Sequence, residues 1–595
     1  MDGYCTGLGC RVRGVTLDCR SYSGCMSADT PHNVGLDQRT IRFGILCNGT
    51  ALQEWQARCI KNLLALDNVQ LALLIIEEPE AQSKGVSLPG RRGSPSDRIA
   101  ARFYMKYLSH PRAYRQTDLT NILSKVPSIK CEPASDGVLR DADIETIRGY
   151  DLDFIIHFGD RDVRGEILNV PRYGIWSFRQ GIEGNRPGHP PCFWEIHRGV
   201  PITGASLERL TGQADCRIIL KKGVLKTISH SYAGNVDSVH FEMAKWAGQM
   251  CSRIRTGAFE SIEVPASREA ISPRTPTNYQ MAAFASWMLR DLIAAKLNAL
   301  FRHEEWNVGV ICEPVHIFLK PDVKPRIHWF PRPPRGRFRA DPFAIIKGET
   351  MYVFLEDYDY RTRKGVISYV EVKDGKAVSQ PRVAMDLPVH VSYPCVFEHA
   401  GEIYCVPETF KLREISLYKA ERFPNQWRKI ATLIRDFAGV DPTVFQHDGR
   451  WWLTCTSVDE GSNLNLYIWH APELVGPWTP HAANPVKTDV RSSRPAGTPF
   501  MHDSILYRPA QDCSVTYGGR IVVNRVLQLT PMEFKEEPAV VIGPFKESPY
   551  PDGIHALSTC GGTVTVIDSK RHVFVWSAFK HLVTRRFARM KMLER

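Results

Sequence analysis

Long apolar runs are missing from this chain of 595 residues, and so are several other signatures that would suggest a function directly. No window holds the ~18 uninterrupted apolar residues that a membrane-spanning helix needs. The best candidate, residues 279–301, contains Arg290, Asp291 and Lys296 and therefore predicts an amphipathic helix. The first residues lack the apolar core of a signal peptide, so we expect a cytoplasmic protein.

Paired cysteines of the CxxC type are also missing, although the chain has 16 cysteines. The lack of such pairs argues against a zinc site with thiolate ligands, and no metal site is expected. Many cysteines stand singly in apolar stretches, as Cys47 and Cys455 do, which is typical of reduced, buried thiols. Four others lie in residues 1–38, which we expect to be disordered, and Met26 within them is a candidate initiator.

Acidic residues are fewer than basic ones, and the formal net charge is +12. No basic repeat interleaved with aromatic residues accompanies this excess, so nucleic acid is not an expected partner. Part of the excess lies in the C-terminal residues 571–595. A solvated basic tail is the simpler interpretation. Peripheral contact of this tail with the inner face of a membrane stays open as the alternative.

The first half of the chain has the pattern of a doubly wound α/β fold. An apolar run over residues 41–47 ends in Asn48-Gly49-Thr50, and a helical pattern and the apolar run 69–76 follow. The turn has one glycine only, so it is no dinucleotide fingerprint. Further strands are expected over residues 152–158 and 174–178. Because such strands place ligands beyond their carboxyl ends, the loops after Phe158 and Phe178 are the expected mouth of a site.

Residues 151–210 contain an apolar strand, the loop Arg186-Pro187-Gly188 and the run Phe193-Trp194-Glu195-Ile196. This stretch resembles the core of the folate-dependent formyltransferases, and the resemblance extends over about residues 41–255. It makes Glu195 and Asp215 candidate catalytic residues. Trp176 and Phe178 stand where that family has the Asn and His that stabilise the oxyanion and move the proton. Trp176 and His189 are candidates for substrate binding instead.

The second half changes to short strands separated by turns, and it contains an internal repeat. The openings Asp341-Pro342, Tyr393-Pro394, Asp441-Pro442 and Arg494-Pro495 recur about every 50 residues, and a fifth unit is expected near His555. Units of this size with four short strands are typical of propeller blades. The chain therefore divides into a disordered segment (1–38), a formyltransferase-like α/β domain (39–255), a linker with an amphipathic helix (256–303), a five-bladed β-propeller (304–570) and a basic tail (571–595).

The innermost strands of a propeller line its central channel, so the residues that open the blades should gather at one end of it. Carboxylates gathered in this way are what sugar recognition or glycosidic chemistry requires. The candidate catalytic residues are Asp341, Glu408 and Asp441. The candidate substrate-binding residues are Arg494, Asp512 and His555.

The runs Ala340-Asp341-Pro342-Phe343, Ser392-Tyr393-Pro394 and Gly476-Pro477-Trp478 carry a further resemblance, which spans nearly all of residues 306–568. The blade pattern is similar to that of the five-bladed arabinanase- and xylosidase-type glycoside hydrolases. It resembles more closely the N-terminal domain of plant glucosamine inositolphosphorylceramide transferases. In that family a nucleotide-sugar transferase domain follows the propeller, and a chain ending at Arg595 is expected to lack it.

Both resemblances imply carbohydrate substrates. We therefore expect a transferase-type enzyme of glycan or glycolipid biosynthesis, such as that of cell-envelope polysaccharide, acting on a sugar or nucleotide sugar. One alternative is a sugar N-formyltransferase that uses 10-formyltetrahydrofolate. Another is a non-catalytic glycan-binding protein, and a glycoside hydrolase is a third. The sequence leaves the cofactor of the first interpretation unknown.

Overall fold

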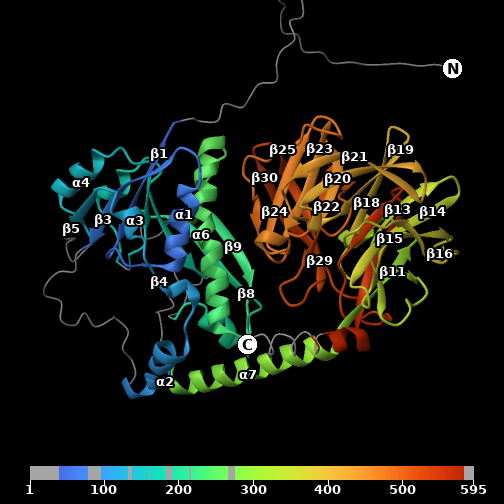
Figure 1. The fold of residues 1–595 in the computed structure, drawn as a ribbon, viewed down its shortest axis with the longest axis horizontal. Coiled ribbons are helices and arrows are strands. Elements are labelled where there is room, and N and C mark those ends of the chain that lie inside the picture. The colour runs from blue at the N-terminus through green and yellow to red at the C-terminus, as the bar shows by residue number, and fades with distance from the viewer. Residues whose placement is uncertain are drawn as a thin grey trace, which may run out of the picture. The chain divides into compact units, whose positions relative to one another are not determined.

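The computed structural model describes residues 39–77, 95–131, 137–159, 161–181, 190–212, 216–265 and 275–581, and residue 584. The predicted disordered segment 1–38 and the end of the predicted basic tail lie outside these residues. Along the described part of the chain, an α/β region is followed by a long helix and a set of antiparallel sheets (Figure 1).

The α/β region is built on one eight-stranded sheet with the order β10-β9-β8-β7-β6-β1-β3-β5. Strands β5, β3, β1, β6 and β7 are parallel, whereas β8, β9 and β10 continue the sheet in antiparallel fashion. The strands are β1 (Ile41–Cys47), β3 (Val69–Glu77), β5 (Ser128–Cys131), β6 (Phe154–His157), β7 (Ile175–Gln180), β8 (Ile202–Arg209), β9 (Cys216–Lys226) and β10 (Ile262–Pro265).

Helices cover both faces of this sheet. On β6, Phe154 and Ile156 join the hydrophobic cluster that contains α1 (Glu54–Leu64) and α6 (Tyr232–Thr256). The intervening Ile155 joins the opposite cluster, which contains Ile144 and Ile147 of α4 (Asp141–Arg148). Successive strand residues point to opposite faces, so a parallel strand covered on both sides must be apolar throughout. This requirement explains the continuous apolar runs in the sequence.

The second half forms five antiparallel sheets, and the predicted five-bladed β-propeller is confirmed. The first blade contains β13 (Arg337–Lys347), β14 (Thr350–Asp359), β15 (Lys364–Lys373), β16 (Lys376–Ala377) and β17 (Arg382–Met385). The second contains β18 (Ser392–His399), β19 (Glu402–Glu408), β20 (Glu414–Arg422) and β21 (Gln426–Arg435). The third contains β22 (Gly439–His447), β23 (Arg450–Ser457), β24 (Asn465–Ala471), β25 (Thr479–Pro480) and β26 (Lys487–Thr488). The fourth contains β27 (Phe500–His502), β28 (Ile505–Asp512), β29 (Arg520–Leu529) and β30 (Phe534–Ile542).

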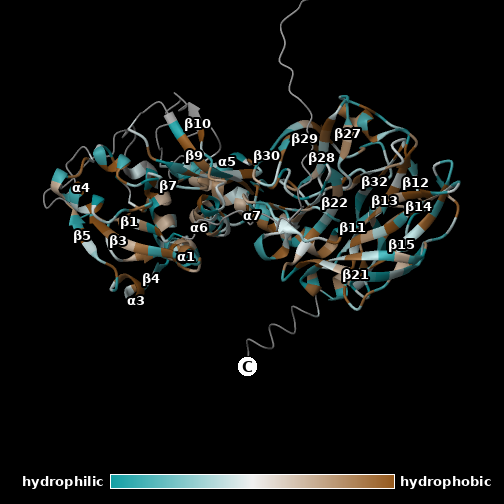
Figure 2. Ribbon diagram, turned by 90° about the horizontal axis from the view of Figure 1, so that it is seen from above, coloured by the Kyte–Doolittle hydropathy of each residue, from teal (hydrophilic) through white to brown (hydrophobic). Residues whose placement is uncertain are grey.

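The fifth blade joins the two ends of the propeller. Its strands are β31 (Leu557–Cys560) and β32 (Val564–Val573) from the end of the domain, and β11 (His303–Ile311) and β12 (His328–Trp329) from its beginning. Strand β11 pairs with β32 along its whole length, from His303 opposite Val573 to Ile311 opposite Thr565. Figure 2 shows hydrophobic residues on the strands and hydrophilic residues on many of the connecting loops.

Local sequence explains the tight hairpins of the blades. Asp448 and Gly449, which join β22 to β23, have φ values of 48° and 69°. Two successive left-handed residues make the type I′ turn, whose twist matches that of the paired strands. The Asp448-Gly449 pair thus accounts for the tight connection between β22 and β23.

The remaining elements connect or flank these two parts. They are β2 (Leu52–Gln53), α2 (Ile99–Phe103), η2 (Tyr104–Leu108), β4 (Gln116–Thr117), α3 (Thr120–Leu123), α5 (Phe193–Arg198) and α7 (Asn278–Phe301), together with short 3-10 turns.

The structure differs from the predicted segments at two places. Strand β10 lies within the predicted linker, where it pairs with β9 at the edge of the α/β sheet. Strand β32 continues to Val573, so Arg571, which the prediction assigned to the tail, belongs to the propeller as Lys570 does. Lys570 is fully buried and Arg571 bonds to Glu305, because both residues lie on a paired strand and not on a free tail.

Candidate functional site

Three of the residues that open the five blades lie on the first strand of their blade (β13, β18 and β22), and the other two lie on the segments just before β27 and β31. The five residues are Asp341, Tyr393, Asp441, Arg494 and His555. We call them the opening residues. Contacts between blades join Asp341 to His555 and Asp441 to Arg494, and the hydroxyl of Tyr393 bonds to the backbone of Gly497 in the fourth blade. The charged side chains are thus gathered in two neighbouring pairs.

One half of the site is a buried ion pair between the third and fourth blades. Arg494 donates from Nε and Nη2 to the two carboxylate oxygens of Asp441, at 2.6 and 3.2 Å. The side chain of Gln511 donates to Asp441 Oδ2 at 2.7 Å, and Arg494 also reaches the hydroxyl of Tyr517 at 3.3 Å. Bidentate contacts between an arginine and a carboxylate fix both the position and the orientation of the carboxylate.

The other half is a chain of three residues between the fifth and first blades. His555 donates from Nδ1 to Asp568 Oδ1 at 2.7 Å, and its Nε2 lies 3.3 Å from Asp341 Oδ1. Asp568 belongs to the second strand of its blade, β32. The ring of Trp306 stacks on His555 at 3.9 Å between centroids. His555 is therefore held between two carboxyl groups with one side of its ring covered.

Carboxylates on second strands also bind the backbone of the next blade. Glu408 ends β19 and accepts the backbone N–H of Asp441 at 2.9 Å, while Asp568 accepts that of Asp341 at 2.8 Å. A third carboxylate, Glu356 on β14, lies opposite Ala340 next to Asp341. Buried backbone N–H groups need partners, and Glu408 and Asp568 supply them.

The backbone is strained at three of the opening residues. Asp341, Tyr393 and Asp441 have φ values of 54°, 44° and 51°, and each lies at a break in the pairing of its strand. A left-handed conformation is costly for residues other than glycine, most of all for a bulky one such as Tyr393. Strain of this kind persists only where surrounding contacts hold it, and it is common at functional sites.

Burial and like charges change the acidity of the site. Burial raises the pKa of Asp341 to about 7, with His555 opposing and Asp441 adding to the rise. Burial also raises the pKa of Glu408 to about 8, and Asp441 contributes further. The pKa of Glu356 is raised for the same reasons. Burial alone would lower the pKa of His555, but Asp568 and Asp341 raise it overall.

This combination can perform general acid–base chemistry near neutral pH. A carboxyl group whose pKa lies near the working pH can both accept and return a proton. Placing it beside a carboxylate that is already paired with a cation separates the roles of two similar groups. A sugar hydroxyl can give its proton to the carboxyl group of raised pKa and can donate a hydrogen bond to the ion-paired carboxylate.

The Asp341, His555 and Asp568 side chains also offer ligand atoms that lie within 4.8 Å of one another, which is the spacing of a candidate metal site. In the structure these atoms bond among themselves, as the 2.7 Å contact of His555 with Asp568 shows. The close spacing of these three side chains is thus explained by a histidine that is ion-paired with two carboxyl groups.

The structure brings together Asp341, Glu408, Asp441, Arg494 and His555, all of which the sequence selected. Asp512 behaves differently, since its carboxylate pairs with Arg520 at 2.8 Å and caps the N–H of Ser514. Sequence reasoning missed Glu356, Asp568 and Gln511. Glu356 could have been found, because it occupies the place in its blade that Glu408 occupies in the next. Glu356 lies opposite Ala340, the residue before Asp341, and Glu408 lies opposite Ser392, the residue before Tyr393.

The candidates in the α/β region are scattered. Trp176 is fully buried, stacks on Phe154 at 3.9 Å and donates its indole N–H to the carbonyl of Tyr173. These contacts give it a place in the core and no exposed face for a substrate. Glu195 lies on α5, and burial raises its pKa. His189 and Asp215 lie outside the described residues.

A different polar cluster lies at the carboxyl ends of β1, β3 and β6. Atoms of Asn48, Glu77 and His157 all lie within 3.4 Å of the point where a Cβ atom on Gly159 would stand. Glu77 is 6% exposed, and burial raises its pKa. This is the edge of the sheet where the sequence predicts a mouth, although it selected none of these side chains.

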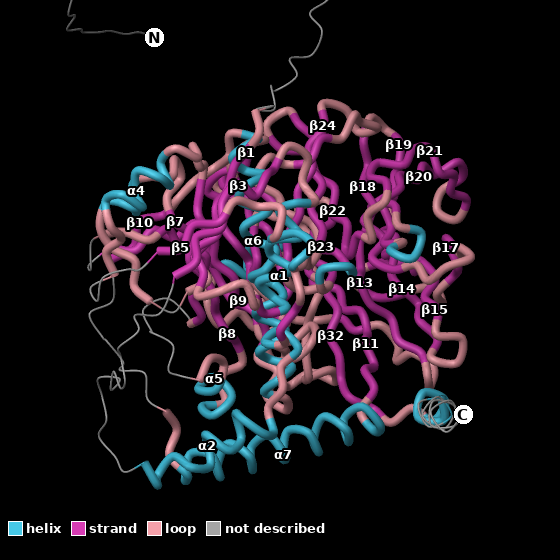
Figure 3. The backbone as a smooth tube through the Cα atoms, turned by 60° about the vertical axis from the view of Figure 1, so that its left-hand side comes forward, coloured by secondary structure: helices cyan, strands magenta, loops and turns pink. Residues whose placement is uncertain are grey.

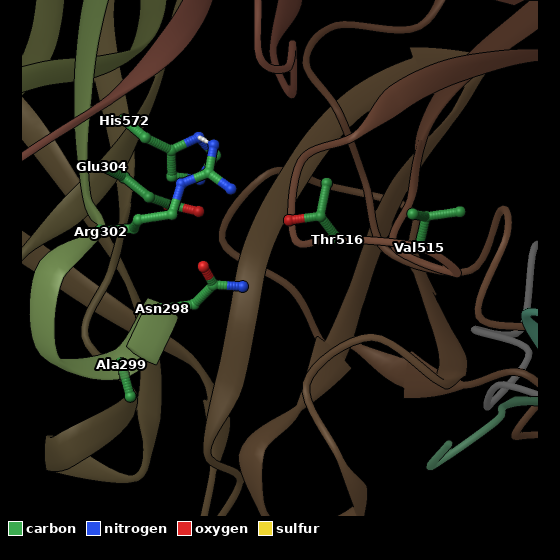
Figure 4. A pocket seen from close by; sticks show the side chains of 7 residues that line it. All are labelled: Asn298, Ala299, Arg302, Glu304, Val515, Thr516 and His572. Atoms are coloured by element: carbon green, nitrogen blue, oxygen red, sulfur yellow. Dashed lines mark hydrogen bonds between the residues drawn. The ribbon is translucent and has the colours of Figure 1, made fainter. Parts of the chain in front are cut away.

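A pocket of about 430 Å³ lies beside the fifth blade. Figure 4 shows Arg302, Glu304 and His572 together on one side of it, with Val515 and Thr516 opposite. Glu304 accepts a hydrogen bond from the buried Lys570 at 2.5 Å, and the Lys570 ammonium lies 5.0 Å from the ring centre of Trp306. Lys570 and Trp306 thus separate this pocket from His555.

Comparison with known proteins finds relatives for the propeller. Residues 333–548 match the family described as glucosamine inositolphosphorylceramide transferase 1, N-terminal. The protein named glucosamine inositolphosphorylceramide transferase 1 from Oryza sativa subsp. japonica is 37% identical over 209 residues, which are 34% of this chain and 28% of the relative. The protein of that name from Arabidopsis thaliana is 37% identical over 207 residues, or 34% and 27%. The match thus spans less than a third of the length of these relatives.

Solved structures show only distant likeness. The family 117 glycoside hydrolase Zg3597 from Zobellia galactanivorans is 14% identical, with a TM-score of 0.31, and the match covers 45% of this chain and 91% of that protein. Glycinamide ribonucleotide transformylase 1 from Symbiobacterium toebii is 15% identical, with a TM-score of 0.23, and the match covers 35% and 84%.

Proposed function

We propose that the protein is a transferase-type enzyme of glycan or glycolipid biosynthesis and that its propeller binds the sugar at the opening residues. The observation that carries this proposal is the pairing of two kinds of carboxyl group at one place. Asp341 and Glu408 have pKa values raised to about 7 and about 8, whereas Asp441 is ion-paired with Arg494.

In this proposal Glu408 or Asp341 accepts the proton of the attacking sugar hydroxyl. A base with a pKa near neutrality takes that proton as the hydroxyl oxygen bonds to the anomeric carbon of the donor sugar, and the bond from this carbon to the phosphate oxygen breaks so that the nucleotide leaves with that oxygen. Asp441, held by Arg494 and Gln511, contributes a fixed negative charge beside the reacting sugar. Preorganised charges of this kind need not rearrange during the reaction, which is why they are effective.

The name of the relatives supports the glycolipid class of substrate, and the family match over residues 333–548 lies in the propeller. We therefore propose inositolphosphorylceramide, or its sugar-bearing headgroup, as the acceptor to test first. The donor in this proposal is a nucleotide sugar bound by the α/β region. Beyond the name of these relatives, the support for this acceptor is the polar, carboxylate-rich centre of the propeller.

The second candidate is a glycan-binding protein without catalysis. One observation favours it: the carboxylates of the site are deeply buried, with Asp341, Glu356 and Glu408 no more than 6% exposed. Formyl transfer has less support, because Trp176 is packed in the core and Phe178 contacts the rings of Trp55 and Phe158.

The test uses the full chain with a panel of nucleotide sugars, and inositolphosphorylceramide in detergent as acceptor. We expect sugar transfer, and at least a hundredfold loss of turnover in Glu408→Gln or Asp341→Asn. Asp512→Asn is the matched control, since Asp512 is equally buried but pairs with Arg520. Saturable binding of the headgroup without transfer would favour the glycan-binding alternative. Stabilisation by folate alone would overturn the proposal.

A further inference from the structure

The long helix α7 exposes most of its apolar side chains. Of its 24 residues, only Met281 and Phe284 are buried. Leu289, Ile293 and Leu297 are 58%, 49% and 51% exposed. The sequence predicts one apolar face packed on the protein, but apolar residues lie on the outer side as well. A helix of this length measures about 36 Å, so the exposed apolar surface is extended.

A second exposed apolar stripe lies beside the start of α7. Ile99, Phe103 and Tyr107 of α2 and η2 follow one another at intervals of four residues and are 60%, 53% and 54% exposed. Residues four apart lie on the same side of a helix. The backbone N–H of Ala100 donates to the side chain of Asn278 at 2.9 Å, which joins α2 to α7.

A third group lies at the other end of α7. Phe574 and Trp576 are 52% and 66% exposed. The rings of Phe301 and Phe574 are 6.2 Å apart, and those of Trp576 and Phe579 are 5.5 Å apart. Figures 1 and 3 both show α2, α7 and the helical residues 576–581 along one edge of the described chain. The three groups therefore form one surface, which we call the α7 surface.

The charges of the α7 surface are mostly of one sign. Helical segments α2, η2 and α7 carry four basic residues and a single acidic one, which are Arg102, Lys106, Arg290, Lys296 and Asp291. The guanidinium of Arg290 lies 4.4 Å from the ring centre of Trp287, and Lys106 lies over Tyr107. Cations at the ends of apolar stems, beside Trp and Tyr, are typical of side chains at a membrane interface.

We propose that the α7 surface binds the surface of an anionic phospholipid bilayer, with α7 lying in the plane of the interface. No helix in the described part of the chain has the length and hydropathy to cross a bilayer, so α7 lies on the membrane. Lipid headgroups of negative charge complement the four basic side chains. A second copy of the chain would bring the same basic residues against one another, since a two-fold interface joins a surface to itself.

This position would also bring the pocket beside the fifth blade to the lipid surface. Asn298 and Ala299, from the last turn of α7, and the adjacent Arg302 line that pocket. The inference does not depend on the proposed transferase activity, because membrane binding is measured without any sugar substrate.

The test is sedimentation of the full chain with sucrose-loaded vesicles of phosphatidylcholine alone and of phosphatidylcholine with 30% phosphatidylserine. We expect binding to the anionic vesicles that weakens as salt is added. The variant Ile293→Asn/Leu297→Asn/Trp576→Ser should bind at least tenfold more weakly. The matched control is Leu527→Asn/Val541→Asn, which removes exposed apolar side chains of the propeller and should bind as the wild type does.

A second variant separates charge from hydrophobicity. Arg102→Glu/Lys296→Glu leaves the apolar side chains in place and should abolish the preference for anionic vesicles. All substituted residues are exposed, and an unchanged thermal transition would confirm that the variants fold. Absence of vesicle binding by the wild type would overturn the proposal. So would a dimer, seen by light scattering, that the α7 variant converts to a monomer while vesicle binding is unaffected.

Discussion

Glu408 accepts the backbone N–H of Asp441 at 2.9 Å, although the two residues belong to different blades. The carboxylate of Asp441 is in turn bound by Arg494 of the next blade. A single chain of contacts therefore connects three blades at the centre of the propeller. Asp568 and Asp341 repeat the first of these contacts between the fifth and first blades. The same groups that set the acidity of the site also hold its strained backbone in place.

We expect the stability of the protein to fall as the pH rises from about 4.5 to about 8. The pKa of Glu408 is raised to about 8 and that of Asp341 to about 7, so the folded protein binds these protons more tightly than the unfolded chain. The stabilisation is complete below the unfolded pKa values and is lost as the pH passes through the folded ones. Melting temperatures of wild type and Glu408→Gln, measured from pH 5 to 8, check this. The variant should show the weaker pH dependence, and parallel curves would contradict the prediction.

We expect Arg494→Ala to destabilise the protein by roughly 3–5 kcal/mol, the usual cost of leaving a buried charge without its partner. Asp441 would keep Gln511 but lose both contacts with the guanidinium. Urea unfolding measures the change. Arg491→Ala is a control of the same residue type, because Arg491 bonds to Asp489 in an exposed position. Equal effects of the two substitutions would refute a special role for the buried pair.

The hydroxyl of Tyr393 is expected to matter for stability. It accepts the backbone N–H of Gly497 at 2.7 Å and bonds to Thr443 at 2.9 Å, and the side chain is fully buried. Tyr393→Phe would leave a buried N–H without that partner, at a cost of roughly 1–3 kcal/mol. Denaturant unfolding checks the value. Tyr404→Phe, at a half-buried position of β19, should change the free energy of unfolding much less.

Gly159→Ala should destabilise the α/β region by roughly 1–3 kcal/mol, as overpacking usually does. The new methyl group would stand 2.7 Å from His157 Nε2 and 3.0 Å from Asn48 Oδ1. Gly543→Ala is the control, because nothing lies within 4 Å of its added methyl group. Thermal unfolding of both variants distinguishes them. If Gly159→Ala has the same melting temperature as the wild type, the cluster around this glycine is less tightly packed than its geometry indicates.

Local patterns predicted much of this architecture. The apolar runs, the Asn48-Gly49-Thr50 turn and the helical spacing after it led to an α/β region, because strand and helix periodicities are properties of short segments. The repeated residue–proline openings led to five blades. They also placed Asp341, Asp441 and Arg494 together, since equivalent positions of a propeller lie around one axis.

Other parts of the site depend on residues that are distant in the sequence. Asp568 lies 227 positions after Asp341, whose N–H it accepts, and no local pattern connects the two. Glu77 and His157 lie on separate strands that meet beside Gly159 only when the sheet has formed. Conversely, Asp512, which the sequence selected for substrate binding, pairs with Arg520, since the register of β28 and β29 places them opposite each other.

The sequence by itself thus determined the class of each half and the positions around the propeller axis, because periodicity and repetition are local. Only the tertiary structure decided which carboxyl groups have raised pKa values and which are paired with cations. Acidity depends on burial and on charges within a few ångströms, and both arise from residues far apart in the chain. The exposure of α7 was decided in the same way, because a helix that the sequence predicts to pack becomes a free surface when no other element covers it.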